Sequence, residues 1–79
     1  MNGEDAVEEL LGTLVDAWSR GMRQVGDDGL TRYERQFWVG LTSGLAASIA
    51  AVSGLPASGL KLSEAIRAGS DIAMSRLRQ

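Results

Sequence analysis

The stretch QFWVGLTSGLAASIAAVSGLPASGL, residues 36–60, contains no charged side chain. It follows Thr31 and Glu34, which have the spacing of a capping box, a pair of reciprocal hydrogen bonds that begins a helix. Gly54 and Pro56 predict the end of that helix, because proline cannot continue the backbone hydrogen-bond ladder. We therefore expect a helix over residues 32–53 that is apolar on every side, and such a helix is normally buried on every side.

Apolar residues at helical spacing also occupy the segments on either side. Residues 4–25 carry apolar side chains every three or four positions, and residues 60–78 repeat this period with a charged face opposite the apolar one. Either Ser58 or Ser63 is expected to cap the third helix. The sequence thus predicts an all-α fold, a three-helix antiparallel bundle with helices at about 4–25, 32–53 and 60–78 in a single domain, residues 1–79.

Small residues recur at four-residue intervals in the central segment. They form two adjacent stripes, namely Gly40, Gly44 and Ser48, and beside them Ser43, Ala47 and Ala51. Glycine inside a helix costs about 1 kcal/mol relative to alanine, and close packing by another helix is the simplest compensation. That helix could belong to the same chain, to a second copy, or to a lipid-embedded assembly. Since small domains bury a small share of their surface, we expect a homodimer with the second helix at its centre.

The residue inventory limits the chemistry that the chain can perform. It has no histidine and no cysteine, so it lacks the commonest general base, the thiolate nucleophile and the usual transition-metal ligands. Asp27 and Asp28 lie in a glycine-rich turn without the alternating spacing of a calcium loop. We therefore expect no enzymatic activity, no metal and no cofactor. The absence of disulfides and the acidic start predict a cytoplasmic location.

Arginines and aromatic residues flank the turn between the first two helices, a combination enriched at protein interfaces. The candidate contact residues are Trp18, Arg20, Arg23, Arg32, Tyr33, Arg35 and Trp38. The competing interpretation is that the arginines only complete helix ends and are solvated. We interpret the chain as a non-catalytic homodimer that binds an unidentified protein. Regulators, adaptors and inhibitors of this size include products of phages and mobile elements, such as anti-CRISPR proteins.

Two alternatives stay open at this stage. Residues 63–77 resemble a helix-turn-helix unit, with Ala65 and Gly69 at the familiar separation but the later apolar positions one residue early. A net charge of −2 gives no general attraction to nucleic acid. Phe37–Leu55 is long enough to span a membrane, although it is rich in alanine, glycine and serine. A DNA-binding regulator and a single-pass membrane protein are therefore the alternative functions.

Overall fold

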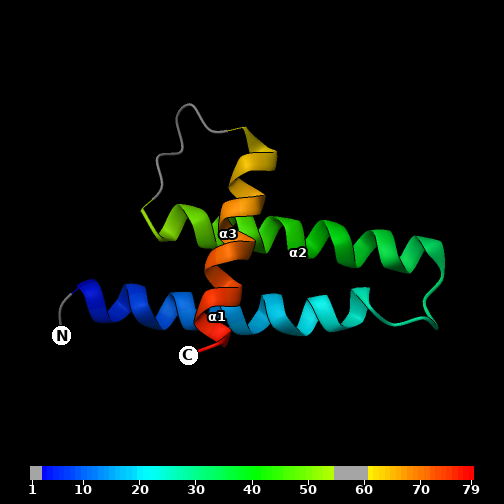
Figure 1. Ribbon diagram of the computed structural model, residues 1–79, viewed down its shortest axis with the longest axis horizontal. Coiled ribbons are helices and arrows are strands. Elements are labelled where there is room, and N and C mark those ends of the chain that lie inside the picture. Colours follow the sequence, from blue (N-terminus) through cyan, green and yellow to red (C-terminus); the bar gives the residue numbers. More distant parts are fainter. Residues whose placement is uncertain (1–2, 55–60) are drawn as a thin grey trace.

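The protein folds into three packed α-helices in the computed structural model, which describes residues 3–54 and 61–79 (Figure 1). The helices are α1 (Gly3–Val25), α2 (Arg32–Val52) and α3 (Leu62–Leu77). The predicted all-α class and three-helix packing are confirmed, and every predicted helix end lies within two residues of the observed one.

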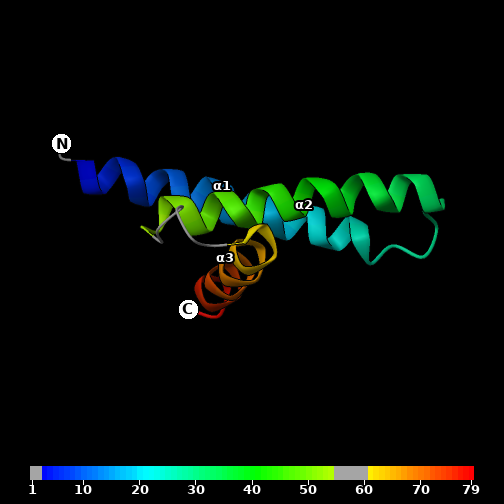
Figure 2. The same ribbon diagram turned by 90° about the horizontal axis from the view of Figure 1, so that it is seen from above.

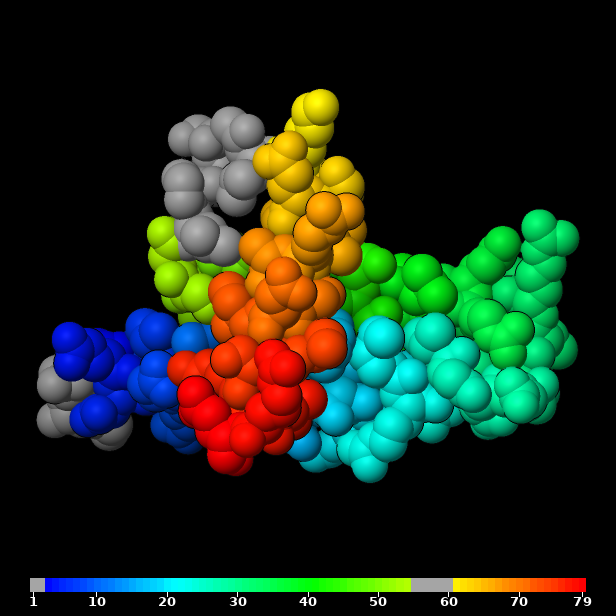
Figure 3. Space-filling view, viewed as in Figure 1, coloured from blue at the N-terminus to red at the C-terminus, as the bar shows by residue number. Residues whose placement is uncertain are grey.

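The first two helices form an antiparallel hairpin, and α3 crosses both of them on one face of that hairpin (Figures 1 and 2). The space-filling view shows α3 lying over the middle of the hairpin, with both ends of the hairpin extending beyond it (Figure 3). The molecule is correspondingly elongated, measuring 43 × 28 × 19 Å along its principal axes. Helix α2 packs against both other helices, as its apolar composition predicts.

Helix α2 has the predicted start and stop. The Glu34 amide donates to Thr31 Oγ1 at 3.1 Å, and the Thr31 amide donates to Glu34 Oε1 at 2.9 Å, which completes the capping box. At the other end, Gly54 has a φ of +90°, and its amide donates to the Ala51 carbonyl at 3.1 Å. Glycine fits this left-handed conformation because it has no Cβ. Pro56 lies outside the described residues.

The start of α3 differs from the prediction. Lys61 occupies the N-cap position and makes no side-chain capping hydrogen bond. Ser63 lies inside the first helical turn, so the prediction that it caps the helix is wrong. Ser58 lies outside the described residues. The helix is then continuous from Leu62 to Leu77, so the turn that a helix-turn-helix unit would need near Gly69 is not formed.

The core lies where the three helices meet. Its buried members come from all three helices and are Leu11, Val15, Trp18, Ala46, Ile49 and Ala73. On α2, only the side facing the other helices is buried, at Thr42, Ala46, Ile49 and Ala50. The outer side of α2 is therefore open in a single copy of the chain, and its burial by a second copy stays a prediction.

Two glycines set how closely the helices approach. A Cβ built on Gly21 of α1 would lie 2.5 Å from the Thr42 Cγ2 methyl of α2. A Cβ built on Gly69 of α3 would overlap the backbone carbonyl of Ala46 in α2. The absence of a side chain at each crossing lets the backbones come together.

Within residues 3–54 and 61–79, none of the helices combines the length and the hydropathy needed to cross a membrane. Of the predicted span Phe37–Leu55, the last helical residue is Val52, and Leu55 lies outside the described residues.

Candidate functional site

The turn between α1 and α2 brings together one end of each helix (Figure 1). Two aromatic side chains near the start of α2 are exposed at this end. Tyr33 exposes 81% of its surface and Phe37 exposes 61%. They lie one helical turn apart on α2, so they share a face. Phe37 also meets Trp38 edge to face, with ring centroids 5.4 Å apart. Large aromatic side chains this exposed are typical of binding surfaces rather than of solvated helix faces.

The two tryptophans pack within the hairpin to different degrees. Trp18 belongs to the core and exposes only 6% of its surface, which corrects its assignment to a contact surface. Trp38 is half-buried, and its ring lies against α1, since a Cβ on Gly21 would be 3.9 Å from Trp38 Cε3. Both tryptophans therefore hold α1 and α2 together.

The four predicted arginines divide by what they contact. Arg35 donates from Nη2 to the Asp27 carbonyl at 2.8 Å and from Nε to the Val25 carbonyl at 3.4 Å, so it fastens the turn to the end of α1. Arg20 forms an ion pair with Asp16 one turn earlier on α1. Arg23 and Arg32 are exposed cations at this end of the hairpin, where Asp27, Asp28 and Glu34 are exposed as well.

The stripe formed by Gly40, Gly44 and Ser48 makes no close contact between the helices of one chain, whereas Ser43 of the second stripe borders α3. A Cβ built on Gly40 or Gly44 would have no neighbouring atom within 4 Å. Ser48 and Ala51 are exposed, while Ser43 and Ala47 are half-buried. The close contacts occur instead at Gly21 and Gly69, which the sequence interpretation did not select. The four-residue spacing of Ala65, Gly69 and Ala73 is the signal that could have located the α3 crossing.

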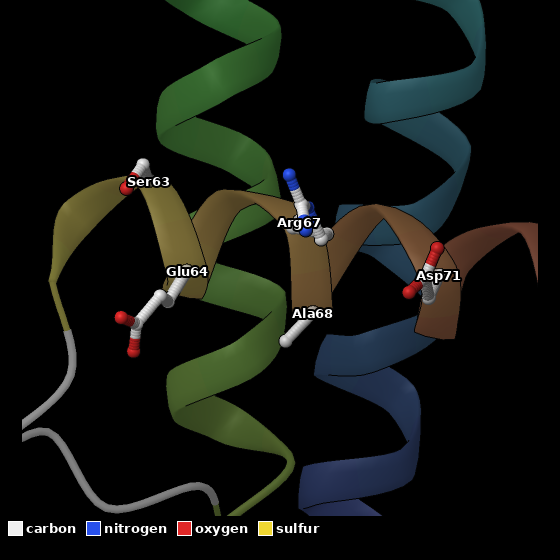
Figure 4. A pocket seen from close by; sticks show the side chains of 5 residues that line it. All are labelled: Ser63, Glu64, Arg67, Ala68 and Asp71. Atoms are coloured by element: carbon white, nitrogen blue, oxygen red, sulfur yellow. The ribbon is translucent and has the colours of Figure 1, made fainter.

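A shallow hollow lies on the outer side of α3 (Figure 4). The residues around it are Ser63, Glu64, Arg67, Ala68 and Asp71, all from this one helix. Figure 4 shows Arg67 between the two carboxylates, which are separated along the helix rather than directed at a common point. Since carboxylates must converge to hold a cation or share a proton, this arrangement gives no basis for a catalytic or metal site.

The Glu34 carboxylate has an altered acidity with a structural cause. The amide and the hydroxyl of Thr31 interact with it in the capping box and lower the pKa of Glu34 below its ordinary value of 4.5. These hydrogen bonds favour the charged carboxylate. The group therefore stabilises the start of α2 and is not poised to transfer protons near neutral pH.

No family model, curated protein or solved structure matches this chain. We call the exposed surface beside the α1–α2 turn the aromatic end, defined by Tyr33 and Phe37 with Arg23 and Arg32 at the same end of the hairpin.

Proposed function

We propose that this chain is a non-catalytic protein-binding protein, a regulator, adaptor or inhibitor, that contacts its partner through the aromatic end. The observation that carries the proposal is the exposure of Tyr33 and Phe37, at 81% and 61%, one turn apart on a helix anchored by a complete capping box. Tyrosine and arginine are the residue types that contribute most to binding energy at protein interfaces.

The local structure favours a preorganised contact. The capping box fixes the first turn of α2, and Arg35 ties the preceding turn to the end of α1. A partner would therefore meet aromatic side chains on a helix that is already folded, and binding would not have to order this segment. Arg23 and Arg32 are exposed at the rim together with the carboxylates of Asp27, Asp28 and Glu34, which suits a partner whose polar rim carries both signs of charge around an apolar centre.

The test compares two matched double variants. Tyr33→Ala with Phe37→Ala removes the aromatic pair, and Leu62→Ala with Met74→Ala removes two exposed apolar side chains on α3. Each protein is immobilised to capture proteins from the native host, and the captured protein is then purified and titrated by calorimetry. Loss of one central contact of about 2 kcal/mol weakens binding about 30-fold, so the double variant should bind more weakly by at least that factor.

The control variant should retain the affinity of the wild-type chain. Equal affinity of the aromatic double variant and the wild-type chain would refute the aromatic end as the binding surface. Both pairs of substituted side chains are solvent-exposed, so we expect the helices of each variant to stay intact. A circular dichroism spectrum of each variant checks this.

A further inference from the structure

The α1–α2 hairpin has two faces, and α3 covers one of them (Figure 2). On α2, Ser43 borders a hollow shared with Ile66 and Ser70 of α3, so this side of the helix faces α3. Two residues along a helix correspond to about 200° of rotation. Leu41 and Leu45, each two residues from Ser43, therefore lie on the opposite side of α2 and point away from α3.

The same reasoning places an apolar row on α1. Glu8 forms an ion pair with Arg76 of α3, with both carboxylate oxygens 2.8 Å from Nη2, and thus lies on the α3 side. Leu10, two residues further, lies on the other side and exposes 47% of its surface. Leu14 and Ala17 continue this row at intervals of four and three residues and are half-buried.

We call the side of the hairpin away from α3 the open hairpin face, defined by Leu10, Leu14, Ala17, Leu41, Leu45 and Val52. Leu10 and Leu41 are exposed on it, while Leu14, Leu45 and Val52 are half-buried and also pack against the core. On α2 the corresponding row is Leu41, Leu45, Ser48 and Val52, whose members are four, three and four residues apart. Both helices therefore carry the alternating spacing of a coiled-coil seam. The Ser48 hydroxyl donates to the Gly44 carbonyl of its own helix at 2.9 Å, so its hydrogen-bonding need is met without water.

We infer that a second copy of this chain covers the open hairpin face, and that the two hairpins together form a four-helix bundle with each α3 on the outside. A hairpin whose two antiparallel helices each present a seam is half of such a bundle. A twofold dimer pairs the same face of both copies, so an uncharged apolar face can be covered by its own copy. The face has no charged member, so stacking it on itself brings no like charges together.

The exposed area of the single chain supports a second copy as the partner that covers this face. The chain exposes 5564 Å². A compact monomer of 8.4 kDa is expected to expose about 4,600 Å², so the excess is on the order of 900 Å². A stable protein interface removes about 800 Å² from each partner. The excess for the whole chain is therefore of the size that one partner loses on forming a stable dimer.

Sedimentation equilibrium tests the oligomeric state of the full chain. We expect the wild-type chain to have twice its 8.4 kDa mass across the micromolar range. Leu41→Arg places a charge in the seam at a position that is 44% exposed in the single chain, and should reduce the mass to that of a monomer with its helices retained. Leu62→Arg, at a 70% exposed position on α3, should remain a dimer.

Spin labelling identifies the face independently of any destabilising charge. The chain has no cysteine, so Ser48→Cys and Ser63→Cys each give a single labelling site. The distance between the two labels of a dimer should be short for Ser48, inside the seam, and long for Ser63, on the outside. A monomeric wild-type chain would overturn the inference, and so would a dimer in which the Ser63 labels are the closer pair.

Discussion

Gly69 of α3 lies directly on the backbone carbonyl of Ala46 in α2, and this contact fixes how closely the two helices cross. Both residues are buried, and Ala73 one turn later on α3 is also buried. A side chain at Gly69 would overlap backbone atoms, which cannot rotate away as the end of a side chain can. The crossing therefore requires glycine at this position.

Gly69→Ala should destabilise the fold although alanine favours helix formation. The better helix propensity contributes about 1 kcal/mol, whereas overpacking of a tight contact costs about 1–3 kcal/mol and more when backbone must move. We expect the melting temperature to fall by about 8 °C or more, since about 1 kcal/mol corresponds to 4–8 °C in a domain of this size. Thermal unfolding followed by circular dichroism measures the change.

Gly12→Ala is the matched control for that substitution. Gly12 is an exposed interior position of α1, and a Cβ there would have no neighbour within 4 Å. Alanine should raise stability at this position by about 0.5–1 kcal/mol. If Gly69→Ala raised the melting temperature as Gly12→Ala does, the close crossing of α2 and α3 would be wrong.

The positions of these crossings show what the sequence could and could not predict. Helix existence and bounds followed from local signals, namely the capping box at Thr31 and the apolar period, and those signals act within a few residues. Which residue a small residue packs against depends on how segments that are distant in the sequence cross each other. Gly40 and Gly44 had the spacing of a packing stripe, yet Gly21 and Gly69 make the close contacts, because pattern alone does not orient one helix on another.

The candidate surface was predicted only in part for the same reason. The sequence pattern alone does not distinguish whether an aromatic residue near a turn lies in the core or on the surface. Trp18 enters the core because its position matches Leu11 and Val15 on one face of α1, while Tyr33 and Phe37 follow the outer face of α2. The outer face of α2 is itself apolar, so hydrophobicity did not separate buried from exposed positions there.

Gly21 and Thr42 provide a test by double substitution. Gly21→Ala would place a methyl group 2.5 Å from Thr42 Cγ2, and we expect a loss of about 1–2 kcal/mol. Thr42→Ser removes that methyl group and keeps the hydroxyl that donates to the Trp38 carbonyl at 2.8 Å. The double variant should therefore be more stable than the sum of the single changes predicts, by about 1 kcal/mol. Urea unfolding of all four proteins gives the coupling, and strict additivity would contradict this contact.

Thr31→Ala tests the contribution of the capping box. Loss of the hydroxyl that accepts from the Glu34 amide should cost about 1 kcal/mol, the usual value for an N-cap. Thr13→Ala is the control, since Thr13 is an exposed helix-interior residue whose hydroxyl bonds to the Glu9 carbonyl of its own helix. Alanine is the better helix former, so this control should not lower stability. Equal urea midpoints for the two variants would argue against a role for the cap.

The lowered pKa of Glu34 predicts how the stability of the fold changes with pH. The hydrogen bonds with Thr31 lower the pKa of Glu34 in the folded chain, so the unfolded chain binds the proton more tightly. The stabilisation that depends on the charge of Glu34 is therefore complete above pH 4.5, the ordinary pKa of the group. It is lost as the pH falls through the lower pKa that Glu34 has in the folded chain. Glu34→Gln keeps an oxygen that can accept from the Thr31 amide and removes the charge. Urea midpoints measured from neutral to acidic pH should show the wild-type advantage over Glu34→Gln disappearing below that pH, and parallel curves would contradict the assignment.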